Sequence, residues 1–125
     1  MAGVRDFQEL VAWRLARELK LLADRLCQRQ TVARDFKFRD QLRDSAASAP
    51  RNIAEGFGRF RHLEFAQFVR IAKASEVELL NHFIDARDRG IITSEEFGDL
   101  EHATKKALKA ANGLIRYLES TPGPR

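Results

Sequence analysis

Apolar residues recur at intervals of three and four along nearly the whole chain, the spacing that places them on one face of an α-helix. No alternating strand pattern appears, and proline and glycine are scarce over most of the sequence. This pattern predicts four helices, at 6–29, 36–60, 63–89 and 94–119, followed by a flexible tail at 120–125. Helices of this length with short connections indicate an all-α fold, an antiparallel up-down-up-down four-helix bundle, with residues 1–125 as a single domain.

Local signals support the predicted helix ends. Asp6 with Glu9, and Thr93 with Glu96, have the spacing of a capping box, in which each side chain accepts a hydrogen bond from the other residue's backbone. Gly90 follows the third predicted helix, where a residue with positive φ commonly ends a helix.

The charge of the chain permits an anionic partner without requiring one. There are 22 basic and 18 acidic residues, which gives a net charge of +4. A single cysteine, Cys27, excludes an intrachain disulfide. The sequence has no apolar run typical of a secretory signal or a membrane span, so we expect a cytoplasmic protein.

The segment from Ser48 to Arg59 breaks several helix rules inside the second predicted helix. Pro50 removes a backbone donor, at a cost of about 3 kcal/mol in a helix interior. Gly56 and Gly58 each cost up to about 1 kcal/mol relative to alanine. Because the apolar stripe keeps its phase through the proline, we expect the helix to continue with a kink or to restart within one turn.

Polar residues around this segment allow two interpretations. They are surface residues, with Glu55 between Arg51 and Arg59 at ion-pair spacing. Alternatively they form a partly buried network in which Asn52 or Glu55 bonds across to Ser75 or Glu78 of the third predicted helix, or to the carbonyl freed by the proline. We favour the network, which would fix helix register or oligomeric state in the bundle or at a subunit interface. The predicted structural and assembly residues are Ser48, Pro50, Asn52, Glu55, Gly56, Gly58, Ser75 and Glu78.

The sequence lacks the motifs of common catalytic sites. A di-iron bundle needs two Glu-x-x-His motifs, and the nearest approach here is Asp99-x-x-His102. The three histidines do not form a ligand cluster, and no phosphate-binding glycine loop or serine elbow appears. We therefore expect no enzyme, no metal and no cofactor, and a metal-dependent enzyme is the weakest alternative.

Basic side chains are concentrated in two stretches, one between Ser45 and Lys73 and one from Lys105 onward in the fourth predicted helix. The functional interpretation is a phosphate-contacting surface, and the alternative is helix-dipole compensation together with solubility. The candidate nucleic-acid-binding residues are Arg51, Arg59, Arg61, Arg70, Lys73, Lys105, Lys106 and Lys109.

The chain also resembles a known family. Phe7-Gln8-Glu9-Leu10-Val11-Ala12-Trp13 is similar to the family's opening Phe-x-x-Leu-x-x-Trp. The resemblance is strongest at Ser48-x-Pro50-x-Asn52-Ile53-Ala54-Glu55-Gly56-x-Gly58-Arg59 and continues at Phe65-x-x-Phe68-Val69-x-Ile71-Ala72-Lys73-Ala74-Ser75 and Glu78-Leu79. These motifs resemble proteins related to those encoded within intervening sequences of bacterial large-subunit ribosomal RNA genes. The accessory variability determinant of diversity-generating retroelements is similar to this group.

The resemblance implies a left-handed bundle that assembles into a homopentameric ring. In the retroelement relatives a basic ring surface binds nucleic acid and a reverse transcriptase. We therefore expect a non-enzymatic homo-oligomer that binds RNA or DNA through basic residues. The alternative is a protein-interaction scaffold without a nucleic-acid role, in which Trp13, Phe36 or Phe60 would form the contacts.

Overall fold

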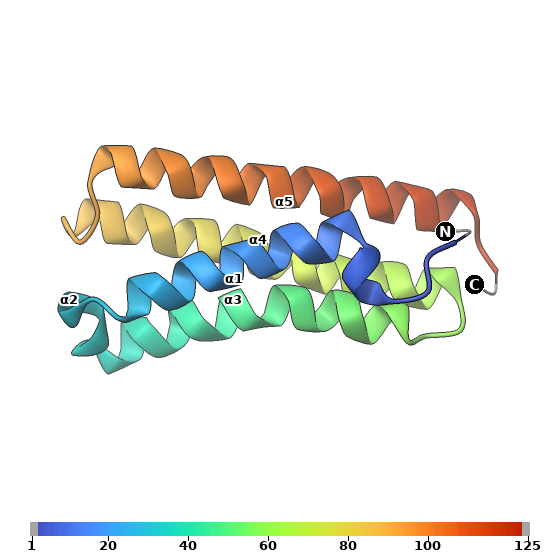
Figure 1. The fold of residues 1–125 in the computed structure, drawn as a ribbon, viewed down its shortest axis with the longest axis horizontal. Helices are drawn as coiled ribbons and strands as arrows, with labels where there is room; N and C mark the ends of the chain where they lie inside the picture. Colours follow the sequence, from blue (N-terminus) through green and yellow to red (C-terminus); the bar gives the residue numbers. More distant parts are fainter. Residues whose placement is uncertain (1–2, 124–125) are drawn as a thin grey trace.

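Four long helices pack together along their lengths in the computed structural model, which describes residues 3–123. The long helices are α1 (Val11–Cys27), α3 (Phe36–Phe57), α4 (His62–Asp88) and α5 (Ser94–Ser120). A 3-10 turn, η1 (Phe7–Glu9), precedes α1, and a single-turn helix, α2 (Gln30–Ala33), connects α1 to α3. Figure 1 shows an elongated bundle with α2 and the α4–α5 connection at one end.

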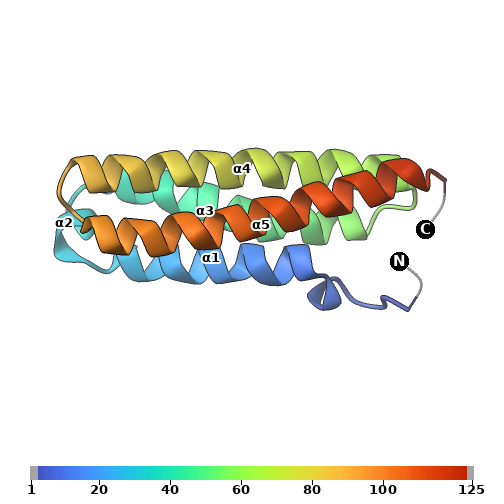
Figure 2. The same cartoon turned by 90° about the horizontal axis from the view of Figure 1, so that it is seen from above.

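Each long helix packs against two others. Helix α1 contacts α3 and α5, and α4 contacts the same two helices. Figure 2 shows α5 lying between α4 and α1. Helices α4 and α5 therefore form one outer face of the bundle.

The core consists of two clusters of buried apolar side chains, one toward each end of the bundle. One contains Leu19, Leu42, Leu79 and Phe83, and the other contains Ile53, Phe65, Val69 and Leu118. Every long helix contributes to both clusters, as its three-and-four spacing requires. Most of the apolar stripes predicted from the sequence therefore lie inside, but Val11 and Phe60, which the spacing also placed on them, are 62% and 67% exposed.

The helix expected over 6–29 is interrupted near its start. Asp6 Oδ1 accepts from the backbone N of Gln8 at 2.8 Å, and Glu9 Oε2 accepts from the backbone N of Asp6 at 2.9 Å. This capping box begins only η1, because Leu10 is extended, with ψ of 127°. Buried Leu10 joins the core at this break, and α1 begins at the next residue.

Helix α3 continues through Pro50 without interruption and ends at Phe57, before the predicted end at residue 60. The single turn α2 was not predicted from the sequence. At the other connection Thr93 and Glu96 form the predicted capping box, with Glu96 N donating to Thr93 Oγ1 at 3.0 Å. Gly90 has the expected positive φ, 74°, beyond the end of α4.

The predicted tail at 120–125 lies partly within the described residues. Ser120 is the last residue of α5. The backbone N of His62 donates to the carbonyl oxygen of Gly123 at 2.9 Å, and the His62 ring contacts Thr121. Residues 124–125 lie outside the described part of the chain. No helix within residues 3–123 combines the length and hydropathy needed to cross a membrane.

Gly56 allows α3 and α4 to approach closely. A Cβ atom at this position would lie 2.7 Å from Phe65 Cδ1 and 2.7 Å from Phe68 Cβ on α4. A Cβ atom at Gly58 would meet only the carbonyl oxygen of Glu55, at 3.4 Å. The two glycines of the motif therefore differ: the first is required by packing between helices, and the second is not.

We expect Gly56→Ala to lower the free energy of unfolding by about 1–2 kcal/mol, because the cost of overpacking exceeds the gain in helix propensity. Chemical denaturation would measure the change. Gly58→Ala is the matched control, and it should change stability by less than about 1 kcal/mol. A Gly56→Ala protein as stable as the parent would contradict the importance of this contact.

Candidate nucleic-acid interface

A hydrogen-bonded bridge connects α3 and α4 beside the core. Ser75 Oγ on α4 donates to Ser48 Oγ on α3 at 2.7 Å. Asn52 Nδ2 donates to the same hydroxyl oxygen at 3.0 Å and to the backbone carbonyl of Ser48 at 2.9 Å. All three side chains are half-buried. This Ser48–Asn52–Ser75 bridge fixes one relative position of the two helices.

The two acidic residues of the motif lie outside the bridge. Glu55 forms an ion pair with Arg59 at 3.2 Å, and Glu78 lies 3.5 Å from His82 Nε2. Both carboxylates are exposed. The sequence-based hypothesis of a direct bond from Asn52 or Glu55 to Ser75 or Glu78 is therefore wrong in detail, since Ser48 mediates the contact. Asn52 and Ser75 are connected only through the Ser48 hydroxyl, to which both side chains bond.

Glu76 is the most unusual polar residue of the core, and the sequence analysis did not identify it. Its exposed fraction is 0%, and neither carboxylate oxygen has a hydrogen-bond partner. On α4 it separates Ala72, in one core cluster, from Leu79, in the other. Burial disfavours the charged form and raises the pKa of Glu76 to about 8. The side chain therefore stays protonated at neutral pH.

The eight predicted basic residues do not form one patch. Arg51 lies on the α1–α3 side, beside Pro50 and Trp13. Arg59 pairs with Glu55, and its guanidinium lies over the Phe68 ring at 4.7 Å from the centroid. Arg61 is the exposed N-cap residue of α4. These three side chains are therefore distributed over one face and one end of the bundle.

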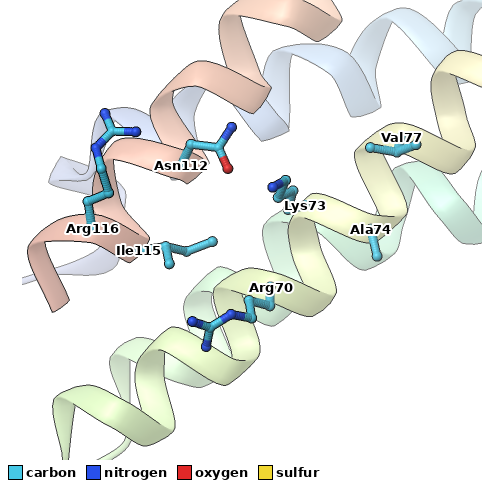
Figure 3. Close-up of a pocket in the computed structure, with 7 residues that line it drawn as sticks. All are labelled: Arg70, Lys73, Ala74, Val77, Asn112, Ile115 and Arg116. Carbon is cyan, nitrogen blue, oxygen red and sulfur yellow. The ribbon is translucent and has the colours of Figure 1, made fainter. Parts of the chain in front are cut away.

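The other predicted residues lie on α4 and α5, where a groove separates the two helices. The α4–α5 groove has a volume of about 520 Å³. Figure 3 shows the four α4 residues following one another along their helix, with the three α5 residues across from them. The groove combines three cations and an amide with apolar side chains, and is lined by Arg70, Lys73, Ala74, Val77, Asn112, Ile115 and Arg116.

Helix periodicity extends this basic surface along α5. Lys105, Lys109, Asn112 and Arg116 follow at steps of four, three and four, so they lie on one stripe of the helix. Lys105 is within 3.7 Å of Glu101, whereas Lys109 makes no ion pair with a described residue. Lys106 is exposed but lies off this stripe. The α5 stripe and the groove together place five cations on one side of the bundle.

Five of the seven groove residues were not candidates in the sequence, and two of these five are polar. Arg116 and Asn112 were not among the candidates, although both continue the spacing of Lys105 and Lys109. One acidic side chain also borders this site, because Glu119 forms an ion pair with Arg70. Both members of the pair are more than two-fifths exposed. An ion pair of this kind is worth only about 0.2–1 kcal/mol.

Other surface features bear on protein contacts. Phe36 and Phe60 are 65% and 67% exposed. Trp13 is half-buried, and its ring lies edge-on to Phe7 at 5.2 Å between centroids. Trp13 therefore packs within its own chain, although it also lines an α1–α3 surface groove. Within residues 3–123, no group of three His, Cys, Asp or Glu side chains is arranged to hold a metal ion.

A comparison with known protein families identifies the family of this chain. The family model described as 23S rRNA-intervening sequence protein matches residues 8–113. The chain belongs to this family. The match includes α1, α3 and α4 whole, together with the glycine contact, the Ser48–Asn52–Ser75 bridge and most of the α5 stripe. No curated protein sequence matches the chain. Membership of the 23S rRNA-intervening sequence protein family suggests a role related to RNA.

Glu76 gives the stability of this family member a predictable pH dependence. The unfolded chain releases this proton near the ordinary glutamate value of 4.5, whereas the folded protein holds it up to about pH 8. Unfolding therefore releases a proton between these values, and rising pH favours the unfolded state. We expect this residue to lower the free energy of unfolding across that window by an amount on the order of 5 kcal/mol, with no further loss above it.

Denaturation of Glu76→Gln across the same pH range tests this expectation. The variant should lose the part of the pH dependence that Glu76 supplies, since glutamine does not titrate. Glu18→Gln is the control, because Glu18 is exposed and its removal should leave the slope unchanged. Parallel curves for the parent protein and Glu76→Gln would contradict the assignment.

Proposed function

We propose that this protein is a non-enzymatic, cytoplasmic homo-oligomer that binds RNA or DNA through basic side chains. The observation that carries the proposal is the α4–α5 groove with the α5 stripe, where five cations lie on one side of the bundle. Clustered arginine and lysine side chains neutralise phosphates and release their counterions. The family's connection with 23S rRNA intervening sequences supports RNA as the first partner to test.

The proposed architecture is the antiparallel up-down-up-down bundle, and its proposed assembly is the homopentamer that the family resemblance implies. The alternating ends at which the chain turns in Figure 1 support the topology. Exposed apolar side chains support self-association, including Val11 and Leu63. Each copy contributes a charge of +4, so a ring would present a strongly basic surface.

Binding across a salt series tests the nucleic-acid function. We expect affinity for RNA or DNA to fall steeply with added salt, because the contacts are mainly to phosphates. The double variant Arg70→Gln/Lys73→Gln should bind more weakly and reduce the log–log salt slope for single strands by roughly 1.4. The matched control is Arg34→Gln/Lys37→Gln, which removes the same charges near α2. Equal slopes in both variants, or no binding at low salt, would contradict the proposal.

A mass measurement in solution tests the assembly. We expect a mass that is a multiple of the 14.3 kDa chain, with five copies as the specific prediction. Light scattering coupled to gel filtration, or native mass spectrometry, would give the number directly. A monomer at micromolar concentration would contradict the proposed homo-oligomer. The nucleic-acid binding experiment does not depend on this result.

The exposed aromatic residues favour a second candidate function, a protein-interaction scaffold. Phe36 is the first residue of α3 and Phe60 lies in the connection that follows this helix, and both are exposed to a partner. Replacing the groove cations with glutamine should leave this scaffold role intact. Replacing Phe36 and Phe60 with serine should abolish it while leaving nucleic-acid affinity unchanged.

A further inference from the structure

The α4–α5 groove contains chemistry that a purely phosphate-binding surface does not need. Phosphate contacts require cations, and the rim supplies Arg70, Lys73 and Arg116. The same groove is lined by the apolar side chains of Val77, one turn beyond Lys73 on α4, and Ile115, and by Asn112, which offers both a donor and an acceptor. This combination matches a whole nucleotide, which has an anionic phosphate, a flat base and a polar base edge.

We propose that the groove holds one nucleotide of single-stranded nucleic acid, with its phosphate on Arg70 and Lys73 and its base against Val77 and Ile115. This inference rests on the proposed nucleic-acid function and names the form of the ligand. Proteins recognise single strands by accepting unstacked bases, whereas a paired base is held inside its duplex and cannot enter a surface groove. Asn112 is placed to bond the edge of the base.

Glu119 regulates this site. The Glu119 carboxylate forms an ion pair with the Arg70 guanidinium, which is the group that the phosphate must contact. The pair is exposed and weak, so a phosphate can displace the carboxylate from the guanidinium. Glu119 thus lowers the affinity of the groove for phosphate, because a ligand must displace this carboxylate from Arg70 before it can bind there.

The experiment measures the affinities of four probes at fixed salt: a short oligouridylate, an oligothymidylate, a blunt duplex of matched length and an abasic strand with the same number of phosphates. We expect the two base-bearing strands to bind more tightly than the abasic strand and the duplex. The two pyrimidine strands distinguish RNA from DNA as the source of the nucleotide. Tighter binding of the duplex, or equal binding of abasic and base-bearing strands, would overturn the proposal.

Val77→Ser tests the base contact. We expect it to weaken base-bearing strands by about tenfold while leaving the abasic strand unchanged, because serine removes the apolar surface that the base would cover. Ile71→Ser is the matched control, since Ile71 lies on the same helix, is 49% exposed against 50% for Val77, and does not line the groove. Equal effects of the two substitutions would overturn the base contact. Circular dichroism of both variants verifies that each is folded.

Glu119→Gln tests the competing carboxylate. We expect it to strengthen binding of every phosphate-containing probe by roughly two- to fivefold, as removal of one exposed ion pair allows. Glu95→Gln is the control, because it removes an exposed charge about 36 Å earlier along α5, at 1.5 Å per residue, away from the α5 stripe. Equal affinities in the two variants would overturn the role of Glu119.

These results separate the two proposals. If no probe binds at low salt, the nucleic-acid function itself fails. In a second outcome, all probes bind with a salt-dependent affinity, the duplex and the abasic strand bind as tightly as the base-bearing strands, and Val77→Ser binds like Ile71→Ser. The nucleic-acid function then stands and the nucleotide groove fails.

Discussion

The close contact between α3 and α4 determines which faces of α4 point inward and outward. Gly56 brings the backbone of α3 against Phe65 and Phe68, and the Ser48–Asn52–Ser75 bridge fixes the register of the pair. Once this register is set, the helical period leaves no freedom for the rest of α4. Arg70, Lys73 and Val77 must face α5, and Ala72, Glu76 and Leu79 must face the core. The groove and the buried carboxyl both follow from this one contact.

The buried carboxyl illustrates how a core accommodates a polar group without a partner. Glu76 lies between two apolar clusters, and neither of its oxygens is hydrogen-bonded. An ionised carboxylate in this position would be very costly, so the group keeps its proton instead. The clusters on either side are otherwise apolar, and Glu76 therefore makes the centre of the bundle sensitive to pH.

Much of the fold could be predicted from the sequence, because the local spacing of apolar residues identifies the face of a helix that becomes buried. The stripes of α3 and α4 and the capping box at Thr93 were readable, since each depends on residues within a few positions. The break at Leu10 was not readable, because the capping box at Asp6 looks the same whether one turn or a whole helix follows. The single turn α2 is too short to show a period.

The candidate site was only partly predictable, for a related reason. The sequence identified Arg70, Lys73, Lys105 and Lys109 as basic, but composition alone could not separate them from Arg51, Arg59 and Arg61, which lie elsewhere. Arg116 and Asn112 join the site through their spacing on α5 and the proximity of α4. The sequence by itself determined the four long helices, most of their apolar faces and the family, because these depend on short-range spacing and residue type. Only the tertiary structure decided that Ser48 bridges to Ser75, that Glu76 is buried without a partner, and that Glu119 pairs with Arg70. Each of these depends on which residues of different helices meet, and that is set by packing between segments far apart in the chain.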